Sequence, residues 1–409
     1  MPSQAADMIG VMRLHRHVGS TVGDAVRAAV PSGFPAGLLS PAGLARIETV
    51  ADQVPGRLTS TFGFEIELGA AADGGDFALA VTGLHGGREM LAGTSEFELP
   101  LAASEHPAWV AVRALSRAWV DPLSGLDPEL HNLALEFNLA EGLEGVPAPN
   151  VFLGARSGIS ARSPLPSAED ERGWAWLTEA ALPLLRGHRL SGSQRETLGR
   201  CFRALPAGSR AFQVGVMLAR PVDALRVCIL GMRYERVAGY LRSIGWPGDA
   251  DALEEQVGPL ARRAESVIVD LDLADRVLPS VGLECFVGEQ GSDRSGRGGG
   301  PEPADAWSPF LQPLVERGLC TPVRERALLE WPLTVRESRA RSWPVHLSEA
   351  SQFLGPDLES SLVRAVNHVK LSWRPDQALT AKAYLRIQHR WQPATASLGR
   401  GAHRSLPQR

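Results

Sequence analysis

The strongest constraint on the fold is a unit that recurs about five times along the chain, a helical segment followed by two short strand-like segments joined by a turn. The strand-like segments are rich in β-branched or aromatic residues and are bounded by turn-forming residues, which is typical of antiparallel hairpins. Such pairs do not build a doubly wound parallel sheet. The predicted hairpins are Thr61–Leu68 with Asp76–Thr82, Leu133–Leu139 with Asn150–Arg156, Ala211–Leu218 with Ala224–Leu230, Ser266–Leu273 with Val281–Val287, and His368–Trp373 with Ala381–Ile387.

Helical segments separate the hairpins, and several of them carry recognisable start signals. The SAED sequence from Ser167 and the SQRE sequence from Ser193 each predict a capping box. Thr321–Pro322 predicts a helix that starts with an N-cap and a first-turn proline. The predicted helical regions are Gly19–Gln53, Ala108–Val120, Ser167–Leu185, Ser193–Leu205, Arg233–Ile244, Ala250–Glu265, Pro309–Arg317, Thr321–Glu330 and Leu358–Val366.

This alternation predicts an α+β protein, a ten-stranded antiparallel barrel built from about five αββ repeats with helices outside. Closure is favoured because it removes the exposed edges of the sheet, although the same ten strands could also split into two sheets. We expect one domain over residues 1–390 with a flexible Gly/Ser-rich insertion at 288–304. A basic tail at 391–409 has little to bury and is expected to be disordered.

Composition excludes several classes of protein. The formal net charge is −4 and the pI is about 6.2, whereas a nucleic-acid-binding domain usually carries a basic stripe. The four cysteines are too far apart for a zinc knuckle and are expected to be reduced. No apolar run is long enough for a membrane span, and the N-terminus lacks the apolar stretch of a signal peptide. We therefore expect a cytoplasmic protein, and its Ala, Gly, Arg and Leu bias is typical of a high-GC bacterial genome.

Polar and charged residues alternate with apolar ones along most predicted strands. Because successive strand residues point to opposite faces, each strand has one apolar face and one face with charges. In an open sheet the charged face is simply solvated, but in a closed barrel it lines the lumen. The residues expected on this face are Glu65, Glu67, Glu136, Asn138, Gln213, Gly215, Met217, Asp270, Asp272, Gly282, Glu284, Phe286, His368, Lys370, Ser372, Lys382, Tyr384 and Arg386, with Arg156 and Arg226 as further basic candidates.

The acidic members of this face allow three interpretations. Carboxylates removed from bulk water raise one another's pKa unless a cation compensates them. They could therefore form internal ion pairs with Lys370, Lys382 and Arg386, bind a cation, amine or guanidinium, or act as general bases. We take Glu65, Glu67 and Glu284 as catalytic candidates. Glu136, Gln213 and Arg226 are candidates for substrate binding.

A metal-dependent alternative comes from the DLDLAD sequence at residues 270–275. Mg²⁺ prefers oxygen ligands, so Asp270 and Asp272 could hold it together with Glu284. We expect no required cofactor and retain Mg²⁺ as an option. The sequence contains no GxSxG motif and no phosphate-binding GK[ST] loop, so hydrolase chemistry and a P-loop have no support.

Two features together point to a known protein family. One is the KAYLR sequence, which puts Lys382, Tyr384 and Arg386 on one face of a strand, and the other is the set of five αββ units. The element order over residues 20–390 resembles the aromatic prenyltransferase (PT-barrel, or ABBA) fold, whose members carry Lys-x-Tyr on a strand. The resemblance implies that a prenyl diphosphate and a small-molecule or peptide acceptor meet inside the barrel, in secondary metabolism or peptide modification.

The same resemblance implies roles for individual residues. Lys370, Lys382 and Arg386 would bind the diphosphate, since Lys and Arg make charge-assisted contacts with phosphate. Tyr384 would shield the carbocation, and Glu65 or Glu67 would orient the acceptor. The alternative is a non-catalytic or scaffold barrel that binds a cationic small molecule or peptide in an acidic lumen. Neither alternative involves nucleic acid or a membrane.

Overall fold

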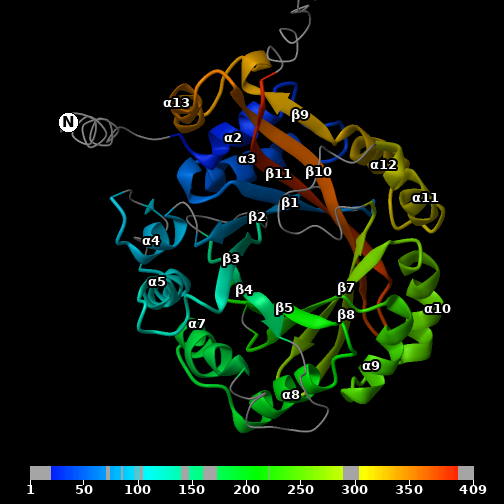
Figure 1. Ribbon diagram of the computed structural model, residues 1–409. Coiled ribbons are helices and arrows are strands. Elements are labelled where there is room, and N and C mark those ends of the chain that lie inside the picture. The colour runs from blue at the N-terminus through cyan, green and yellow to red at the C-terminus, as the bar shows by residue number, and fades with distance from the viewer. Residues whose placement is uncertain are drawn as a thin grey trace, which may run out of the picture.

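The computed structural model describes residues 20–70, 74–83, 86–96, 99–100, 105–139, 147–159, 173–220, 222–288 and 304–394. Eleven antiparallel strands form one sheet in the order β11-β1-β2-β3-β4-β5-β6-β7-β8-β10-β9, and β10 also pairs with β11. The second pairing closes ten of the strands into a barrel and leaves β9 as an addition to β10. Figure 1 shows the strands as a ring with the helices outside it. The predicted closed α+β barrel is therefore confirmed.

The strands follow the chain around the barrel with few exceptions. Each hairpin is joined to the next by helices, so consecutive strands are neighbours from β1 to β8. The strands are β1 (Thr61–Glu67), β2 (Gly75–Thr82), β3 (Leu130–Phe137), β4 (Asn150–Ile159), β5 (Arg210–Val216), β6 (Leu225–Leu230), β7 (Ser266–Leu273), β8 (Val277–Phe286), β9 (Leu333–Arg336), β10 (Leu358–Trp373) and β11 (Thr380–Pro393).

The helices occupy the connections on the outer side of the barrel (Figure 1). The α-helices are α2 (Val22–Ala29), α3 (Pro41–Ala51), α4 (Gly87–Ala92), α5 (Pro107–Val120), α7 (Leu182–Arg186), α8 (Gly192–Arg203), α9 (Val237–Ser243), α10 (Ala250–Ala261), α11 (Ser308–Glu316), α12 (Pro322–Glu330) and α13 (Val345–Leu354). Shorter 3₁₀ or π turns cover Gly56–Leu58, Trp176–Ala181, Tyr234–Arg236, Ala304–Trp307 and Glu337–Arg339.

The outer faces of the strands supply the core between barrel and helices. Phe64, Phe77 and Phe137 lie side by side on β1, β2 and β3, with ring centroids 6.2 and 6.0 Å apart. Trp109 of α5 continues the row at 6.1 Å from Phe137. Trp119, on the same helix, donates its indole N–H to a strand carbonyl at 3.1 Å, so each tryptophan combines apolar burial with a satisfied polar group. Because these faces pack against the helices, the opposite faces of the strands point into the barrel.

Several predicted elements need correction. All five hairpins are present, but Leu358–Val366 is wrong as a helix, because it forms the first half of β10. Its apolar positions lie between β9, β8 and β11, and burial on both faces removes the alternation that marks a strand. The predicted tail also begins too early, since β11 continues to Pro393. Strand β9 and helices α4 and α13 were not predicted.

The helix start signals had mixed outcomes. Thr321 caps α12 as predicted, accepting a hydrogen bond from the Arg324 backbone N–H. The capping box of α8 uses Ser191 and Gln194 and not Ser193, two residues earlier than predicted. The predicted box at 167–170 lies outside the described residues, as does residue range 289–303 of the predicted insertion.

Candidate functional site inside the barrel

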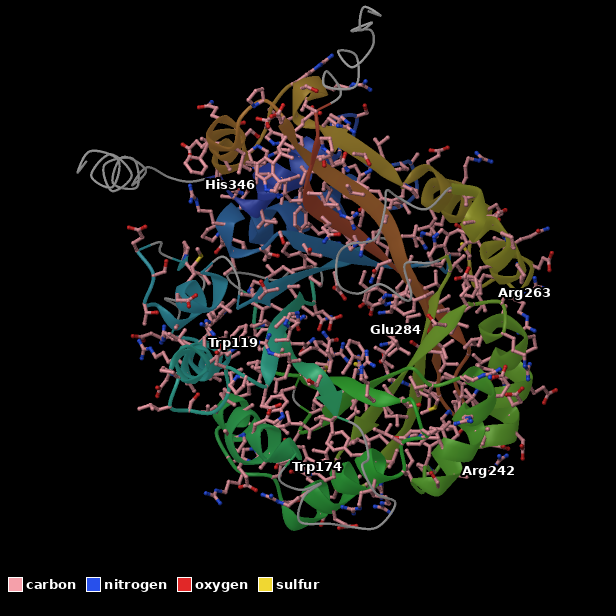
Figure 2. All side chains as sticks on the ribbon, viewed as in Figure 1. Trp119, Trp174, Arg242, Arg263, Glu284 and His346 are labelled. Carbon is pink, nitrogen blue, oxygen red and sulfur yellow. The ribbon has the colours of Figure 1, made fainter. Side chains whose placement is uncertain are left out.

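The strand register places the predicted charged residues on the inner face. Glu65 lies opposite Tyr384, and Lys370 lies opposite both Lys382 and Glu284. Figure 2 shows Glu284 directed into the ring of strands, whereas labelled residues such as Arg242 lie outside it. Because β10 pairs with β11 and closes the barrel, this face of the strands lines the lumen.

A pair of carboxyl groups, Glu65 and Glu136, forms the centre of the site. Glu65 accepts hydrogen bonds from Lys382 Nζ at 2.6 Å and from the Tyr384 hydroxyl, and it shares a hydrogen bond with Glu136. Burial alone would raise the pKa of Glu65, but Lys382, Glu136 and Tyr384 outweigh it and lower this pKa to about 2. Burial and the adjacent Glu65 charge raise the pKa of Glu136 to about 8. At neutral pH the pair therefore holds one proton, on Glu136.

Glu136, the second member of the pair, is almost completely buried. Glu136 is 8% exposed, and its Oε2 has no hydrogen-bond partner among the described residues. Burying an acceptor without a hydrogen bond costs free energy. The carboxyl pair thus combines an ionised acceptor, Glu65, which Lys382 holds in place, with a protonated and buried Glu136 beside it.

A second ion pair joins Lys370 of β10 to Asp270 of β7. Lys370 Nζ donates to Asp270 Oδ2, and both residues are at least nine-tenths buried. Burial would lower the pKa of Lys370, but Asp270 and Glu284 outweigh it, so the lysine stays charged. Gly282 on β8 makes room for the pair, since a Cβ there would lie 2.6 Å from Lys370 Cε. Oδ1 of Asp270 has no hydrogen-bond partner within the described part of the chain.

A third ion pair, between Arg226 and Asp272, lies nearer the hairpin end of the barrel. The guanidinium binds the carboxylate through Nε at 2.8 Å and through its terminal nitrogen at 3.2 Å, and Ser280 Oγ donates to Asp272 at 3.1 Å. Burial would raise the pKa of Asp272, but Arg226 outweighs it and lowers this pKa. Bidentate geometry of this kind is strong and fixes both side chains.

Electrostatic interactions join these groups into one interior charge network. Glu136, for example, interacts with Arg226 and Lys370 as well as with Glu65. Carboxyl groups predominate over cations in the network, so its net charge is negative even with Glu136 protonated. Its acidic members are Glu65, Glu67, Asp76, Glu136, Asp270, Asp272 and Glu284, and its basic members are Arg226, Lys370 and Lys382.

A separate basic group lies further along β11. Arg386 and Arg390 are four residues apart on the inner face, and Gln388 between them accepts hydrogen bonds from Arg390 at 3.0 and 3.2 Å. Burial and the neighbouring charge of Arg390 lower the pKa of Arg386. Both guanidinium groups are half-buried, and together they make this part of β11 basic.

Aromatic and apolar side chains line the interior beside these charged groups. His368 stacks on Tyr384 with ring centroids 4.2 Å apart, and it lies 5.1 Å from the ring of Phe286. Phe286 packs with Cys228 and Ile268 in an interior apolar cluster, which Phe152, Phe212 and Leu230 extend. The interior thus offers hydrocarbon surface directly beside the ion pairs.

A cavity of about 560 Å³ lies where the helical connections meet the barrel. It is lined by the end of β6, the start of β7, the first residue of β5 and Gly288 after β8, and its basic residues are Arg210, Arg233 and Arg262. Leu230 belongs both to this lining and to the apolar cluster. The cavity therefore borders the apolar side of the interior.

The remaining predicted site residues have less prominent places. Glu67 is at the rim, 3.5 Å from Lys382 and with a side chain 57% exposed. Gln213 is on the inner face of β5, opposite Cys228. No group of three His, Cys, Asp or Glu side chains within the described ranges is arranged to hold a metal ion. Since Asp270 and Asp272 are engaged by Lys370 and Arg226, the Mg²⁺ assignment stays a prediction.

Sequence reasoning missed three contributors. Asp76 accepts hydrogen bonds from the Leu139 backbone N–H at 2.8 Å and from Asn138 at 2.9 Å, and burial and Glu65 raise its pKa. Arg390 was missed because the strand was expected to end at residue 387, although its period-two spacing from Arg386 was visible. The sequence does not show which residues of neighbouring strands lie opposite each other. Gly282 therefore could not be recognised as the residue that makes room for the Lys370 side chain.

Comparison with known proteins adds no identity to this geometry. A scan against protein-family models gives no match, and a search of curated proteins gives none either. Among the helices of the described residues, none has the length and apolar character needed to cross a membrane. Any function proposed for the chain therefore follows from the barrel and its interior.

Proposed function

We propose that this chain is a PT-barrel-like transferase that moves a prenyl group from a prenyl diphosphate to an acceptor inside the barrel. The observation that carries the proposal is the closed ten-stranded antiparallel barrel whose inner face holds a carboxyl pair at one level and paired arginines further along β11. A transferase that ionises an allylic diphosphate needs these two environments, a cationic one for the leaving group and a basic oxygen for the acceptor's proton. The likeness of the barrel to the PT-barrel fold supports the proposal by analogy.

Individual residues take the following roles in the proposal. Arg386 and Arg390 bind the diphosphate, with Lys382 and Lys370 reaching it when they exchange a carboxylate oxygen for a phosphate oxygen. The Tyr384–His368 stack presents π-faces to the developing allylic cation, as aromatic rings do for cations. Glu65 is ionised over the physiological range and takes the proton from the acceptor after the bond to C1 has formed, when the acceptor is cationic and strongly acidic. Cys228, Ile268 and Phe286 supply apolar surface for the hydrocarbon.

The reaction balances without a cofactor. The C1–O bond of the prenyl diphosphate breaks, and its electron pair leaves with the diphosphate. The acceptor's nucleophilic atom forms the new bond to C1 and loses a proton to Glu65. Mg²⁺ could accompany the diphosphate as its counter-ion, and the expectation that no cofactor is required stays a prediction.

The proposal is tested by calorimetric titration with dimethylallyl and geranyl thiodiphosphate, with and without Mg²⁺. We expect binding to wild type that Arg386→Gln weakens about 10- to 100-fold, the usual range for losing a charge-assisted contact. Lys382→Ala should weaken it too. Arg242→Gln on the outer surface, where the side chain is 55% exposed, is the control and should bind normally. Absence of binding to wild type under both conditions would overturn the proposal.

A second candidate is a non-catalytic barrel that binds a cationic molecule. The observation favouring it is the negative interior charge network, in which Lys370 and Lys382 are each engaged by a carboxylate. This candidate predicts affinity for an organic cation, none for thiodiphosphates and no transfer to any acceptor. The same titrations, followed by mass spectrometry for prenylated product, separate the two candidates.

A further inference from the structure

The cavity at the connection end of the barrel has no part in the transfer reaction. Its lining comes from the first residue of β5, the end of β6 and the connection after it, the end of α10, the start of β7, and Gly288. None of these residues belongs to the interior charge network or to the Arg386 group. Its volume of about 560 Å³ lies within the range of about 300–1,000 Å³ that is usual for small-molecule sites. The cavity can therefore hold a ligand of its own.

Three hydrogen-bond donors of this lining have no partner in the part of the chain that the structure describes. They are the guanidinium of Arg210 and the hydroxyls of Tyr234 and Ser266. Tyr234 is only 7% exposed, so its hydroxyl has little bulk water to bind. A buried polar group without a partner costs free energy, and such groups in folded proteins are usually satisfied. The cavity thus presents unused donors from β5, from the connection after β6 and from β7.

Two of these donors are held in place by their surroundings. The stem of Arg210 lies against Gly158, where a Cβ would be 2.4 Å from Arg210 Cδ. Tyr234 is covered by Arg262, whose guanidinium carbon lies 5.4 Å from the centre of the tyrosine ring. Side chains that are already positioned lose less conformational freedom when a ligand binds. This part of the lining is therefore prepared for a ligand.

The charges of the lining favour an anion as that ligand. Arg233 lies 3.8 Å from Glu235, and Arg262 is paired with a glutamate of α10, whereas Arg210 makes no ion pair within the described residues. Arg210 can bind a carboxylate or a phosphate through two parallel N–H donors, and the two hydroxyls can donate to the same group. A cation would have only the exposed Glu265 as an unpaired charged partner.

The rest of the lining is largely apolar. Leu230, Met232 and Val267 contribute hydrocarbon to the cavity. Leu230 also packs against the interior apolar cluster, so the apolar surface continues beyond the cavity. An anion without an apolar body would leave this surface uncovered, whereas each methylene group that a ligand buries tightens its binding about fourfold. The lining therefore matches a molecule with an anionic head and a hydrocarbon body.

We propose that this cavity binds an amphipathic anion, a carboxylate or phosphate group carried on a hydrocarbon chain. The head group lies on Arg210 and the two hydroxyls, and the chain lies along Leu230 and Val267. This site goes beyond the proposed transfer reaction and does not rest on it, because the two share no residue that contacts an anion.

The proposal is tested by calorimetric titration of the full chain at pH 7 with octanoate and with octyl phosphate. Octylamine and octanol are comparison probes of equal chain length. We expect at least one of the two anions to bind at least about 10-fold more tightly than either comparison probe. Hexanoate, which is two methylene groups shorter, should bind about 10-fold more weakly than octanoate.

Variants locate the binding. Arg210→Gln should weaken anion binding about 10- to 100-fold and Tyr234→Phe about 3- to 10-fold, the ranges for losing a charged and a neutral hydrogen bond. Arg220→Gln is the matched control and should bind like wild type. Arg220 is also exposed and without an ion pair among the described residues, and it lies in the turn between β5 and β6, at the opposite end of the same hairpin.

Four results would overturn the inference. They are absence of anion binding to wild type, octylamine or octanol binding as tightly as the anions, anion binding that survives in Arg210→Gln, and equal affinity for hexanoate and octanoate. Arg210 is exposed, so its replacement should leave the fold intact, which thermal melting checks. A preference for octanoate or for octyl phosphate supports the site in either case and identifies the head group as a carboxylate or a phosphate.

Discussion

The buried Lys370–Asp270 pair shows how single residues in this interior depend on one another. Removing two charges from water is expensive, and the pair recovers this cost only while both partners are present. The glycine at position 282 keeps the space in which they meet. Neutralising one residue therefore leaves its partner as an uncompensated buried charge. This destabilises the folded protein more than neutralising both residues.

This dependence predicts an unusual pattern in a double-mutant cycle. Asp270→Asn should destabilise the protein by about 3 kcal/mol, because a buried lysine loses its counter-charge. Adding Lys370→Met should recover much of that loss, since the remaining groups are then neutral. Chemical denaturation of wild type, both single variants and the double variant measures this. Additive effects would show that the two residues are not coupled.

The carboxyl pair predicts a pH dependence of stability. Glu136 has a pKa of about 8 in the folded protein and about 4.5 as an ordinary glutamate, so the folded chain holds a proton that the unfolded chain releases. Its contribution to the free energy of unfolding is fully present below pH 4.5 and is lost as the pH rises toward 8. Between pH 5 and pH 8, wild type should lose at least about 1.4 kcal/mol relative to Glu136→Gln. Parallel stability curves for the two proteins would contradict this.

At the scale of elements, β10 departs most from expectation. Its first half pairs with β9 and β11, its second half pairs with β8 and β11, and an irregularity between Val366 and His368 separates the two parts. The strand thus belongs to the barrel and also to an extension outside it. Its residues are buried almost throughout, which explains why the run from Leu358 looked helical in the sequence.

The pairing of β1 with β11, which helps to close the barrel, brings Gly63 close to the backbone of Leu385. A Cβ at Gly63 would lie 2.1 Å from the backbone carbonyl oxygen of Leu385, and backbone cannot move aside as a side chain can. We expect Gly63→Ala to lower the free energy of unfolding by about 2 kcal/mol or more through overpacking. Gly69→Ala, where a Cβ meets nothing within 4 Å, is the control in the same denaturation experiment. Equal stability of the two variants would show that the β1 and β11 backbones shift apart to make room for the methyl group.

Much of the fold and less of the site could be predicted from the sequence. Hairpins were recognisable because their strands alternate and their turns contain Gly, Pro and Asp, and this alternation also placed Glu65, Lys370 and Tyr384 on one face. Pairing was not predictable, because register depends on contacts between residues such as Glu65 and Lys382 that are 317 positions apart. Strand alternation therefore indicated most residues of the inner face without showing which cation neutralises which carboxylate.

At the scale of the whole molecule, closure of the barrel both pairs the sheet edges and encloses the interior charges. Without β11, both β1 and β10 would expose an unpaired edge, which is a template for aggregation. A chain ending at Trp373 should be insoluble or lack a cooperative unfolding transition, whereas a chain ending at Ala394 should melt within about 2 °C of wild type. Soluble, cooperative unfolding of the shorter chain would show that closure is dispensable.

Closure also sets the order in which the protein can be completed during synthesis. The first barrel strand leaves the ribosome more than 300 residues before the strand that completes its pairing, as the contact of Thr61 with Gln388 requires. Throughout that interval the nascent sheet is open and its interior carboxylates and lysines are in water. Long-range pairing of this kind slows folding. The enclosed interior therefore comes into existence only in the last step of folding, so that a truncated translation product lacks it altogether.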